Sequence, residues 1–442
     1  MIARNARNLR IGDRLAPLAA VFLVLTACDN DNSDTTGSIL EVWAHAGQES
    51  ERSVLIDQVA QFNAREADVE VRLTLIPEGS YNAQVQAAAV AGGLPDLLEL
   101  DGPFLYAYVW QGRLQPLDRL LPEGLRADLL PSIIEQGRYH DRLWAFGTFD
   151  SGLGLYADRV QLEQADIRIP DLNTPWDAAE FEDILERLAT RDADGQVLDL
   201  KLNYAGEWYT YGFSPLIQSA GGGLIDRSDV ARAEGVLDGP SSIGAMRRIQ
   251  SWILRGRVDP NIDDAAFATR RVALALGGHW NYPRYSGRLG EDLLLLPLPD
   301  LGHGPKTGQG SWCWAVTADS TQPDGAARFL AFLLEPDQIL AMTAANGAVP
   351  ATRRAIARSP LYRPGGPLDL FVEQLDGGYA VPRPPTPAYP VITAEFQKAF
   401  DRIRSGGEVQ AALQRAARVI DLEIEDNQGY PLVGRAREET IR

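Results

Sequence analysis

Two glycine-rich stretches have the letters of phosphate-binding loops, and each lacks a part that the chemistry requires. GLGLYA at residues 152–157 fits the dinucleotide pattern G-x-G-x-x-A, but it precedes a strand-like run where such a site needs the N-terminus of a helix. GHGPKTG has Lys306 and Thr307 in phosphate-loop order, yet Pro305 occupies the glycine position and removes a backbone donor. Neither stretch predicts a nucleotide site.

The sequence also contains an incomplete calcium-loop pattern, and it lacks a motif for a catalytic nucleophile. RDADGQVLDLK offers Asp192, Asp194 and Gly195 in calcium-loop order, but Thr190 and Lys201 stand where the first carboxylate and the bidentate glutamate belong. An Asp-Gly turn explains this stretch. The chain has no G-x-S-x-G elbow, and its four histidines have neither metal-ligand spacing nor neighbouring cysteines. We therefore expect no cofactor and no metal.

The first part of the folded chain predicts a β-α-β-α-β unit. Short apolar or alternating runs predict strands at SILEVWA, DVEVRLTLI and PDLLELD, and the stretches between them, SERSVLIDQVAQFN and SYNAQVQAAAVAGG, have helical patterns. This order requires a parallel sheet with helices on both faces. Ligands of such sheets lie beyond the carboxyl ends of the strands. The side chains at those ends are Trp43, His45, Gln48, Glu49 and Asp101.

A second α/β region begins near LWAFGTFDSGLGLYADRV, a strand-like run broken by Gly147, Gly152 and Gly154. Helical patterns follow in DAAEFEDILERLA, SIGAMRRIQSWILRG and GAARFLAFLLEP. The C-terminal part predicts two amphipathic helices over residues 391–404 and 409 to about 425. No internal repeat is visible.

Length and charge restrict the class of protein. A chain of 442 residues exceeds one ordinary core, so it is expected to form two or three domains or two lobes with a cleft between them. The net charge of −18, with scattered arginines and no lysine-rich run, argues against a nucleic-acid partner. Of the two cysteines, Cys313 lies between two tryptophans and is expected to be a small buried hydrophobic residue.

The N-terminus predicts an export signal. A basic segment with four arginines precedes an apolar segment of 13 residues, 15–27, which is within the length of a secretory signal and too short to span a bilayer. LTAC resembles the bacterial lipobox, which implies a mature chain that begins at lipidated Cys28; a plain signal peptide with a chance cysteine is the alternative. The polar residues up to about Ser38 predict a flexible tether.

Several longer stretches together resemble the family 1 extracellular solute-binding proteins of ABC importers, the sugar-binding lipoprotein group. They occur in the family's order over nearly all of residues 38–430. The stretches are LEVWAHAGQES, FNAREADVEVRL, YNAQVQAAAVAGGLPDLLELD, LWAFGTFDSGLGLYADR, RRVALALGGHWNY, GSWCWAVTADSTQPDGAARFLAFLLEPD, ANGAVPATR and PRPPTPAYPVITAEFQKAFDRIRSGGEVQAALQRAARVID. One departure from the family is LYAD at 155–158, where the family often has tyrosine-tyrosine-asparagine-lysine.

The resemblance implies a periplasmic-binding-protein-like type II fold, with two doubly wound α/β lobes, a hinge of two or three crossovers and a ligand cleft between the lobes. We expect a signal peptide over 1–27, a tether over 28–38, a first lobe from 38–149 and 301–348, and a second lobe from 150–300 and 349–442. The glycine-rich AFGTFDSGLG fits the first crossover, although its glycines could equally serve packing.

The resemblance also implies which residues face a ligand. Pyranose rings stack their apolar faces on aromatic rings, and their hydroxyl groups need fixed donors and acceptors. The expected ligand-binding residues are Trp43, Gln48, Glu49, Asp101, Asp150, Trp208, Trp280, Tyr282, Ser311, Trp312 and Arg383. Each tryptophan could instead pack in the core, the two aspartates could cap helices or turns, and the arginine could pair with a surface acid.

The implied function is the binding component of an ABC importer, which captures a di- or oligosaccharide and delivers it to permease subunits without catalysis. The expected protein is a monomer, bound to the outer face of the cytoplasmic membrane only through its lipid anchor. Two alternatives stay open. Glycerol phosphate or another polar solute would require a cationic cleft formed by Arg383 with Arg353 or Arg284. A secreted glycoside-active enzyme would use two of the 60 acidic residues, which spacing alone does not exclude.

Overall fold

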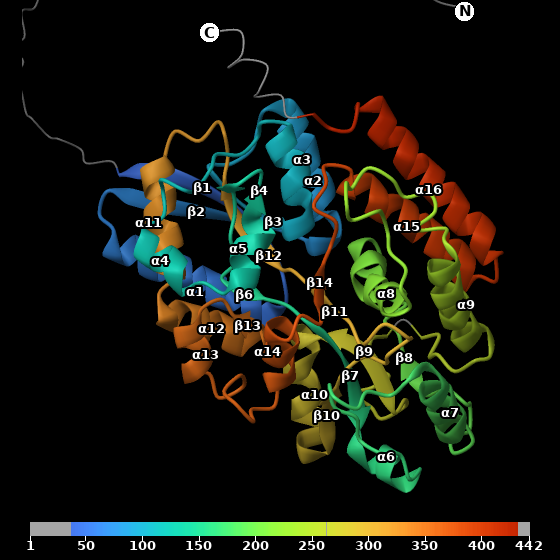
Figure 1. The fold of residues 1–442 in the computed structure, drawn as a ribbon. Coiled ribbons are helices and arrows are strands. Elements are labelled where there is room, and N and C mark those ends of the chain that lie inside the picture. The colour runs from blue at the N-terminus through green and yellow to red at the C-terminus, as the bar shows by residue number, and fades with distance from the viewer. Residues whose placement is uncertain (1–36, 262, 432–442) are drawn as a thin grey trace, which may run out of the picture. The chain divides into compact units, whose positions relative to one another are not determined.

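The computed structural model describes residues 37–261 and 263–431, all within the compact unit that starts at residue 37 (Figure 1). The predicted signal peptide and lipidated Cys28 lie outside the described residues. Among the described helices, none is both long enough and apolar enough to cross a bilayer.

The predicted β-α-β-α-β unit is confirmed. Strands β1 (Ser38–His45), β2 (Val69–Ile76) and β3 (Leu97–Asp101) alternate with helices α1 (Glu49–Arg65) and α2 (Glu78–Ala91). Strand β1 lies parallel to both β2 and β3, and β12 (Trp312–Val316) joins antiparallel to β3, which gives the order β12-β3-β1-β2. The carboxyl ends of β1 and β3 therefore lie at one edge of this sheet.

Both faces of this first sheet are buried by helices. On one face, Leu40 and Val42 of β1 are fully buried and pack with α1, α11 (Pro323–Leu333) and α12 (Pro336–Asn346). The opposite face packs Leu98 and Leu100 of β3 against α2 and α3 (Leu105–Trp110). Each fully buried leucine or valine stabilises the fold by about 1.5–3 kcal/mol. Helices on both faces explain why these strands are apolar runs.

A second, mixed sheet has the order β10-β7-β9-β8 and forms the core of the second lobe. Its strands are β7 (Leu153–Asp158), β8 (Leu198–Asp199), β9 (Leu274–Gly278) and β10 (Leu293–Leu296). Its cluster includes helices α7 (Ala178–Ala189), α8 (Glu207–Ser219), α9 (Pro240–Leu254), α15 (Tyr389–Arg404) and α16 (Val409–Asp426). GLGLYA lies largely within buried β7, so no helix begins there to hold a phosphate.

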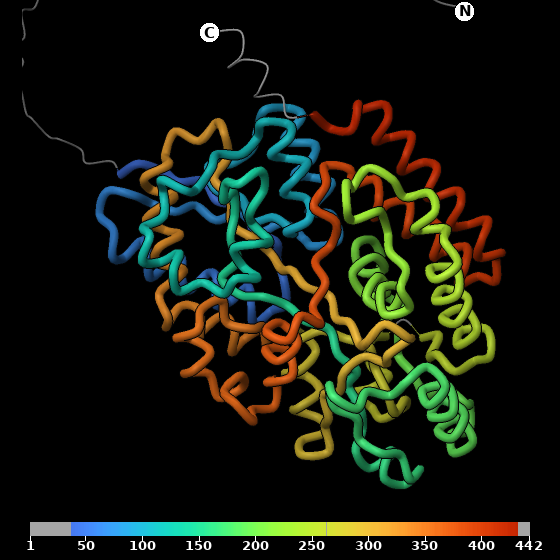
Figure 2. Tube along the Cα trace, in the orientation of Figure 1, coloured from blue at the N-terminus to red at the C-terminus, as the bar shows by residue number. Residues whose placement is uncertain are grey.

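Three chain passages connect the two sheets, which matches the expected hinge, and Figure 2 traces them along the chain. The first passage contains β6 (Phe149–Asp150), which pairs with β13 (Val349–Pro350). The second and third contain β11 (Thr307–Gln309) and β14 (Ala380–Pro382), which pair in parallel. Gly152 in the first passage serves packing, because a Cβ there would lie 2.6 Å from the ring of Phe371.

The lobe boundaries remain predictions. The hydrophobic clusters of the two lobes suggest that one of these boundaries should be moved. Residues 348–371 share a hydrophobic cluster with the first sheet, whereas α15 and α16 pack in the second lobe. We propose that the final crossover to the second lobe lies near β14 rather than at residue 349. On this proposal the first lobe includes residues 349–371, which the sequence pattern assigned to the second lobe.

The remaining short elements connect these layers. They are η1 (Gly102–Phe104), α4 (Glu123–Asp128), α5 (Pro131–Gly137), β4 (Arg138–Tyr139), β5 (Arg142–Leu143), α6 (Arg159–Gln164), η2 (His279–Asn281), α10 (Tyr282–Leu289), η3 (Gly290–Asp292), α13 (Arg353–Arg358) and α14 (Asp369–Asp376).

Candidate ligand-binding site

Arg383 lies just after hinge strand β14 and bridges the two lobes. Its Nη2 donates to Asp101 Oδ1 at 3.1 Å, at the carboxyl end of β3 in the first lobe. Its Nη1 donates to Glu207 Oε1 at 2.6 Å, at the first residue of α8 in the second lobe. The guanidinium also lies over the ring of Tyr211, 4.8 Å from its centroid. Arg383 is 8% exposed, so it does not form the surface ion pair that the sequence left open.

The charges of this bridge influence one another strongly because they are buried. Burial raises the pKa of Asp101 to about 7, although the nearby Arg383 guanidinium acts in the opposite direction. Burial alone would lower the pKa of Arg383, but Asp101 and Glu207 hold that pKa well above its usual value. Tyr389, at the start of α15, donates its hydroxyl to Glu207 Oε1. The bridge therefore contains a permanently charged arginine and a carboxyl group that can take up a proton near neutral pH.

Asp150, at the end of β6, is fully buried beside this bridge. Its Oδ1 accepts hydrogen bonds from the backbone N–H of Ser151 at 2.7 Å and of Gly310 at 3.3 Å. Burial raises its pKa, while the hydrogen bonds from the backbone N–H groups of Ser151 and Gly310 oppose this rise. The hydrogen bond from Ser151 to Asp150 Oδ1 forms a turn, which is one of the roles that the sequence left open for Asp150. This bond leaves the second carboxyl oxygen, Oδ2, unoccupied.

Unpartnered polar atoms gather around these charges. The polar junction is defined as Asp101, Gln136, Asp150, Glu207, Tyr211, Ser311, Arg383 and Tyr389. Ser311 belongs to it because its backbone N–H donates to Gln136 Oε1 at 2.5 Å. Among the described residues, buried atoms of the polar junction without a hydrogen-bond partner are Gln136 Nε2, Asp150 Oδ2, Glu207 Oε2, Tyr211 Oη, Ser311 Oγ and Arg383 Nε. Because buried polar groups are normally satisfied, this concentration makes the polar junction the candidate ligand site.

Aromatic rings lie beside the polar junction in the second lobe. The partly buried ring of Trp280 lies edge-on to Trp208 at 6.1 Å and tilted to Tyr211 at 6.2 Å. Trp208 is 7% exposed, packs in the second core and donates its Nε1 to the carbonyl of Leu200, which agrees with the core role considered from the sequence. Gln48 of the first lobe donates its Nε2 to the carbonyl of Trp280 at 3.0 Å, so the two lobes also touch here.

A second aromatic group lies in the first lobe at the end of β1. The partly buried ring of Trp312 stacks on His45, with centroids 3.8 Å apart and planes at 5°. His45 Nδ1 is 2.7 Å from Glu99 Oε2. Burial alone would lower the pKa of His45, but Glu99 and Glu51 together hold that pKa well above its usual value, which favours the protonated imidazole. A cation against an indole face stabilises this stack and fixes the ring of Trp312.

The other predicted residues are less closely associated with the polar junction. Trp43 is partly buried in the same cluster as Trp312. Glu49 is exposed at the start of α1 and pairs with Arg52. Tyr282 is partly buried against the clusters around α10 and the first lobe. Their roles in binding stay predictions.

Sequence reasoning missed Gln136, Glu207, Tyr211 and Tyr389. None of them follows a strand of the first sheet, where ligands were expected. Glu207 opens a helix, and an acidic residue there ordinarily indicates interaction with the helix dipole. Its partner Arg383 is 176 residues away along the chain, so no local pattern could connect the two.

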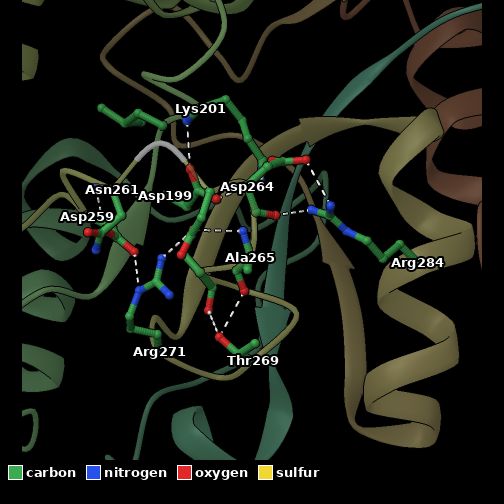
Figure 3. A network of polar contacts seen from close by, with 12 residues as sticks. Asp199, Lys201, Asp259, Asn261, Asp264, Ala265, Thr269, Arg271 and Arg284 are labelled. Carbon is green, nitrogen blue, oxygen red and sulfur yellow. Dashed lines mark hydrogen bonds and ion pairs between the residues drawn. The ribbon is translucent and has the colours of Figure 1, made fainter. Parts of the chain in front are cut away.

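A second charged cluster lies in the second lobe, and each of its charges has a partner (Figure 3). The lysine network is defined as Asp199, Lys201, Asp259, Asp264, Arg271 and Arg284. The fully buried Lys201 Nζ lies 2.6 Å from Asp199 Oδ2 and 2.7 Å from Asp264 Oδ1. Arg284 contacts Asp264 at 2.9 Å, and Arg271 contacts Asp259 at 2.7 Å. This cluster is structural.

The stretch that resembles a calcium loop forms a turn. Asp192 Oδ1 accepts from the backbone N–H of Asp194 at 2.9 Å, and Gly195 has a φ of +70°, as in an Asp-Gly turn. Within residues 37–261 and 263–431, no group of three or more His, Cys, Asp or Glu side chains could hold a metal ion. Cys313 is a free, fully buried cysteine, as predicted.

Solved structures share this fold. The GacH receptor of Streptomyces glaucescens aligns with a TM-score of 0.73 at 20% identity, over 87% of this chain and 98% of that chain. The protein Lmo0181 of Listeria monocytogenes aligns with a TM-score of 0.75 at 15% identity, over 88% and 99%. The maltodextrin-binding domain MalE of Bdellovibrio bacteriovorus aligns with a TM-score of 0.73 at 16% identity, over 88% and 100%. The periplasmic-binding-protein-like fold is thereby confirmed.

Sequence comparison places the chain in a family. An uncharacterized lipoprotein encoded in the oleD 5′ region of Streptomyces antibioticus is 22% identical over 363 residues, which cover 79% of this chain and 78% of that relative. The model of the bacterial extracellular solute-binding proteins matches residues 57–363, which is more than half of the chain. The chain therefore belongs to the bacterial extracellular solute-binding proteins.

Proposed function

We propose that this protein is the substrate-binding component of an ABC importer and that it captures a carbohydrate at the polar junction. The observation that carries the proposal is the concentration of buried, unpartnered polar atoms where both lobes meet at the hinge. They include both donors and acceptors, which hydroxyl groups of a sugar require. The partly buried rings of Trp280 and Trp312 offer the apolar surfaces on which pyranose rings stack.

The similar structures support this ligand class. The structures of the GacH receptor, Lmo0181 and the Bdellovibrio MalE domain include complexes with acarbose, cycloalternan and maltotriose, respectively. Each of these ligands contains several linked rings. We infer that the same fold in this chain accommodates a di- or oligosaccharide.

The charged residues do not favour an anionic ligand such as glycerol phosphate. That alternative needs free cations, but Arg383 already contacts two carboxylates. Arg284 contacts Asp264 at 2.9 Å, and the exposed Arg353 lies 3.7 Å from Asp376. No observation favours a glycoside-active enzyme over a binding protein.

We further propose a lipid anchor at Cys28 that holds the protein at the outer face of the cytoplasmic membrane. The support is the lipobox-like LTAC and the relative described as a lipoprotein. Several acyl chains are needed for stable anchoring, as in bacterial lipoproteins. Metabolic labelling with a fatty-acid probe tests this, and labelling that persists in Cys28→Ser would contradict it.

Isothermal titration calorimetry of the purified full chain with mono-, di- and trisaccharides tests the main proposal. We expect saturable binding of at least one di- or oligosaccharide. Absence of binding to every saccharide, together with binding of another solute class, would overturn the carbohydrate assignment. Incubation with glycans, followed by a reducing-end assay, tests the enzyme alternative, and released reducing ends would support that alternative.

A further inference from the structure

The polar junction contains more carboxyl groups than cations. Asp101, Asp150 and Glu207 face a single guanidinium, that of Arg383, which contacts the first and the third at 3.1 and 2.6 Å. The other arginine near hinge strand β14, Arg227, is exposed and donates to a backbone carbonyl, that of Pro382. In a buried site the electrostatic cost of an unmatched carboxylate is large, because water does not screen it.

Two carboxyl oxygens of the junction stand ready to accept hydrogen bonds. Glu207 Oε1 is occupied by Arg383 and Tyr389, whereas Glu207 Oε2 has no partner. Asp150 Oδ1 is occupied by two backbone N–H groups, whereas Asp150 Oδ2 has no partner. A neutral hydroxyl group donates one hydrogen bond, but a protonated amine donates up to three and also supplies the missing positive charge.

We propose that the polar junction selects a saccharide that carries a protonated amine, whose ammonium group is received by the free oxygens of Glu207 and Asp150. Hydroxyl groups of the same ligand are bound by Gln136, Ser311 and Tyr211, each of which has an unpartnered side-chain atom. This inference rests on the proposed function and specifies its ligand class, a basic amino sugar rather than a neutral or acetylated sugar.

The raised pKa values of Asp101 and Asp150 predict how proton binding would change when an ammonium group enters the junction. Burial raises the pKa of Asp101 to about 7 and also raises that of Asp150, with Arg383 opposing both shifts. Glu207 and Glu78 raise the pKa of Asp101 further through their negative charges. An ammonium group in the junction would oppose these effects. Its binding near neutral pH is therefore expected to release protons, which a neutral sugar would not do to the same extent.

Calorimetry with matched ligand pairs tests the inference. Each neutral disaccharide is paired with its diamino and di-N-acetylamino counterparts of the same linkage, for example cellobiose, the glucosamine disaccharide and chitobiose. At pH 6.5 we expect the amine to bind at least about tenfold more tightly than both partners, as charge-assisted hydrogen bonds are roughly twice as strong as neutral ones. Repetition in two buffers of different ionisation heat measures the released protons.

The variant Glu207→Gln keeps the shape and removes one negative charge. We expect the amine-to-neutral affinity ratio to fall about tenfold, while the affinity for the neutral sugar changes less. Glu123→Gln is the matched control, because Glu123 is also the first residue of a helix but is exposed. It should leave the ratio unchanged. A thermal melt of each variant verifies that it is folded.

The outcomes separate this inference from the proposed function. Tighter binding of the amine, lost in Glu207→Gln, supports the inference. Equal or tighter binding of the neutral or acetylated sugar contradicts the inference and leaves the carbohydrate function standing. If no saccharide of any pair binds, both fail.

Discussion

The polar junction and the lysine network each contain three carboxyl groups, two of them on buried residues, but they differ in how these groups are paired with cations. In the lysine network every aspartate has a cation within 2.9 Å, supplied by Lys201, Arg271 or Arg284. In the polar junction Arg383 pairs with Asp101 and Glu207 but not with Asp150, and several neighbouring polar atoms lack partners. The full pairing is consistent with a structural role for the lysine network, and the incomplete pairing at the hinge is the basis of our proposal that a ligand supplies the remaining partner in the polar junction.

The largest expected effect is a loss of stability when the fully paired lysine network is broken. Lys201→Met leaves Asp199 without a cation and deprives Asp264 of one of two. We expect the free energy of unfolding to fall by about 3–5 kcal/mol, as is typical when one partner of a buried ion pair is removed. Urea denaturation followed by circular dichroism measures this change.

Lys398→Met is the matched control for that experiment, because Lys398 is 61% exposed and pairs only with Glu395. Its effect should be below about 1 kcal/mol. A Lys201→Met protein as stable as this control would show that the lysine network is not structural. Affinity of the folded fraction for saccharide should be unchanged in both variants.

The next effect concerns binding. Trp280→Ala removes the ring that lies beside Tyr211 and Trp208. We expect saccharide affinity to fall about 30-fold, the effect of losing an aromatic residue that contributes about 2 kcal/mol to binding. Calorimetry measures the affinity. Trp110→Ala, which removes a ring packed on Tyr430, is the control; an equal loss of affinity in the control would mean that the site does not depend on Trp280.

A further effect is a pH dependence of stability to which Asp101 of the polar junction contributes. The pKa of Asp101 is about 7 in the folded chain and about 4 when unfolded. Between these values the folded state holds a proton that the unfolded state has released. Asp101 therefore makes the free energy of unfolding decrease as the pH rises from about 4 to 7, by at most about 1.4 kcal/mol per unit.

Asp101→Asn should remove this contribution. His279 acts in the opposite direction, since burial lowers its pKa to about 4, but it is present in both proteins and cancels in the comparison. Urea denaturation at several pH values gives the difference between wild type and variant. An unchanged pH slope in the variant would contradict the assignment of this titration to Asp101.

The smallest effect is expected outside both clusters. Arg353→Ala removes an exposed ion pair with Asp376, whose closest atoms are 3.7 Å apart. Stability should change by less than about 0.5 kcal/mol, and saccharide affinity should not change. A marked loss of affinity in calorimetry would favour the cationic site that the sequence left open.

The sequence predicted much of the fold because its helices and strands carry strong periodic patterns. The alternating β2 and the long amphipathic α16 are examples. The hinge strands β6, β11 and β14 contain only two or three residues, too few for a pattern. The packing of residues 348–371 against the first sheet depends on tertiary contacts, which local spacing does not reveal.

The site was predictable only where it follows a strand or a family stretch. Asp101 was named from its position at the end of a strand, and Asp150 and Arg383 were named from the resemblance. The ion pair that connects Arg383 with Asp101 joins residues 282 positions apart. The sequence does not show which carboxylates are paired with cations, because that pairing depends on distances in the folded chain. It therefore could not distinguish the lysine network from the polar junction.

The central claim is that the incompletely paired polar junction binds the saccharide. Its most direct test is the affinity of Asp150→Asn, measured by calorimetry with whichever saccharide binds the wild type most tightly. Asparagine keeps the acceptor for the two backbone N–H groups and changes the unpartnered oxygen to an amide nitrogen. We predict at least about a tenfold loss of affinity with a nearly unchanged melting temperature. Unchanged affinity in a folded variant would contradict the claim.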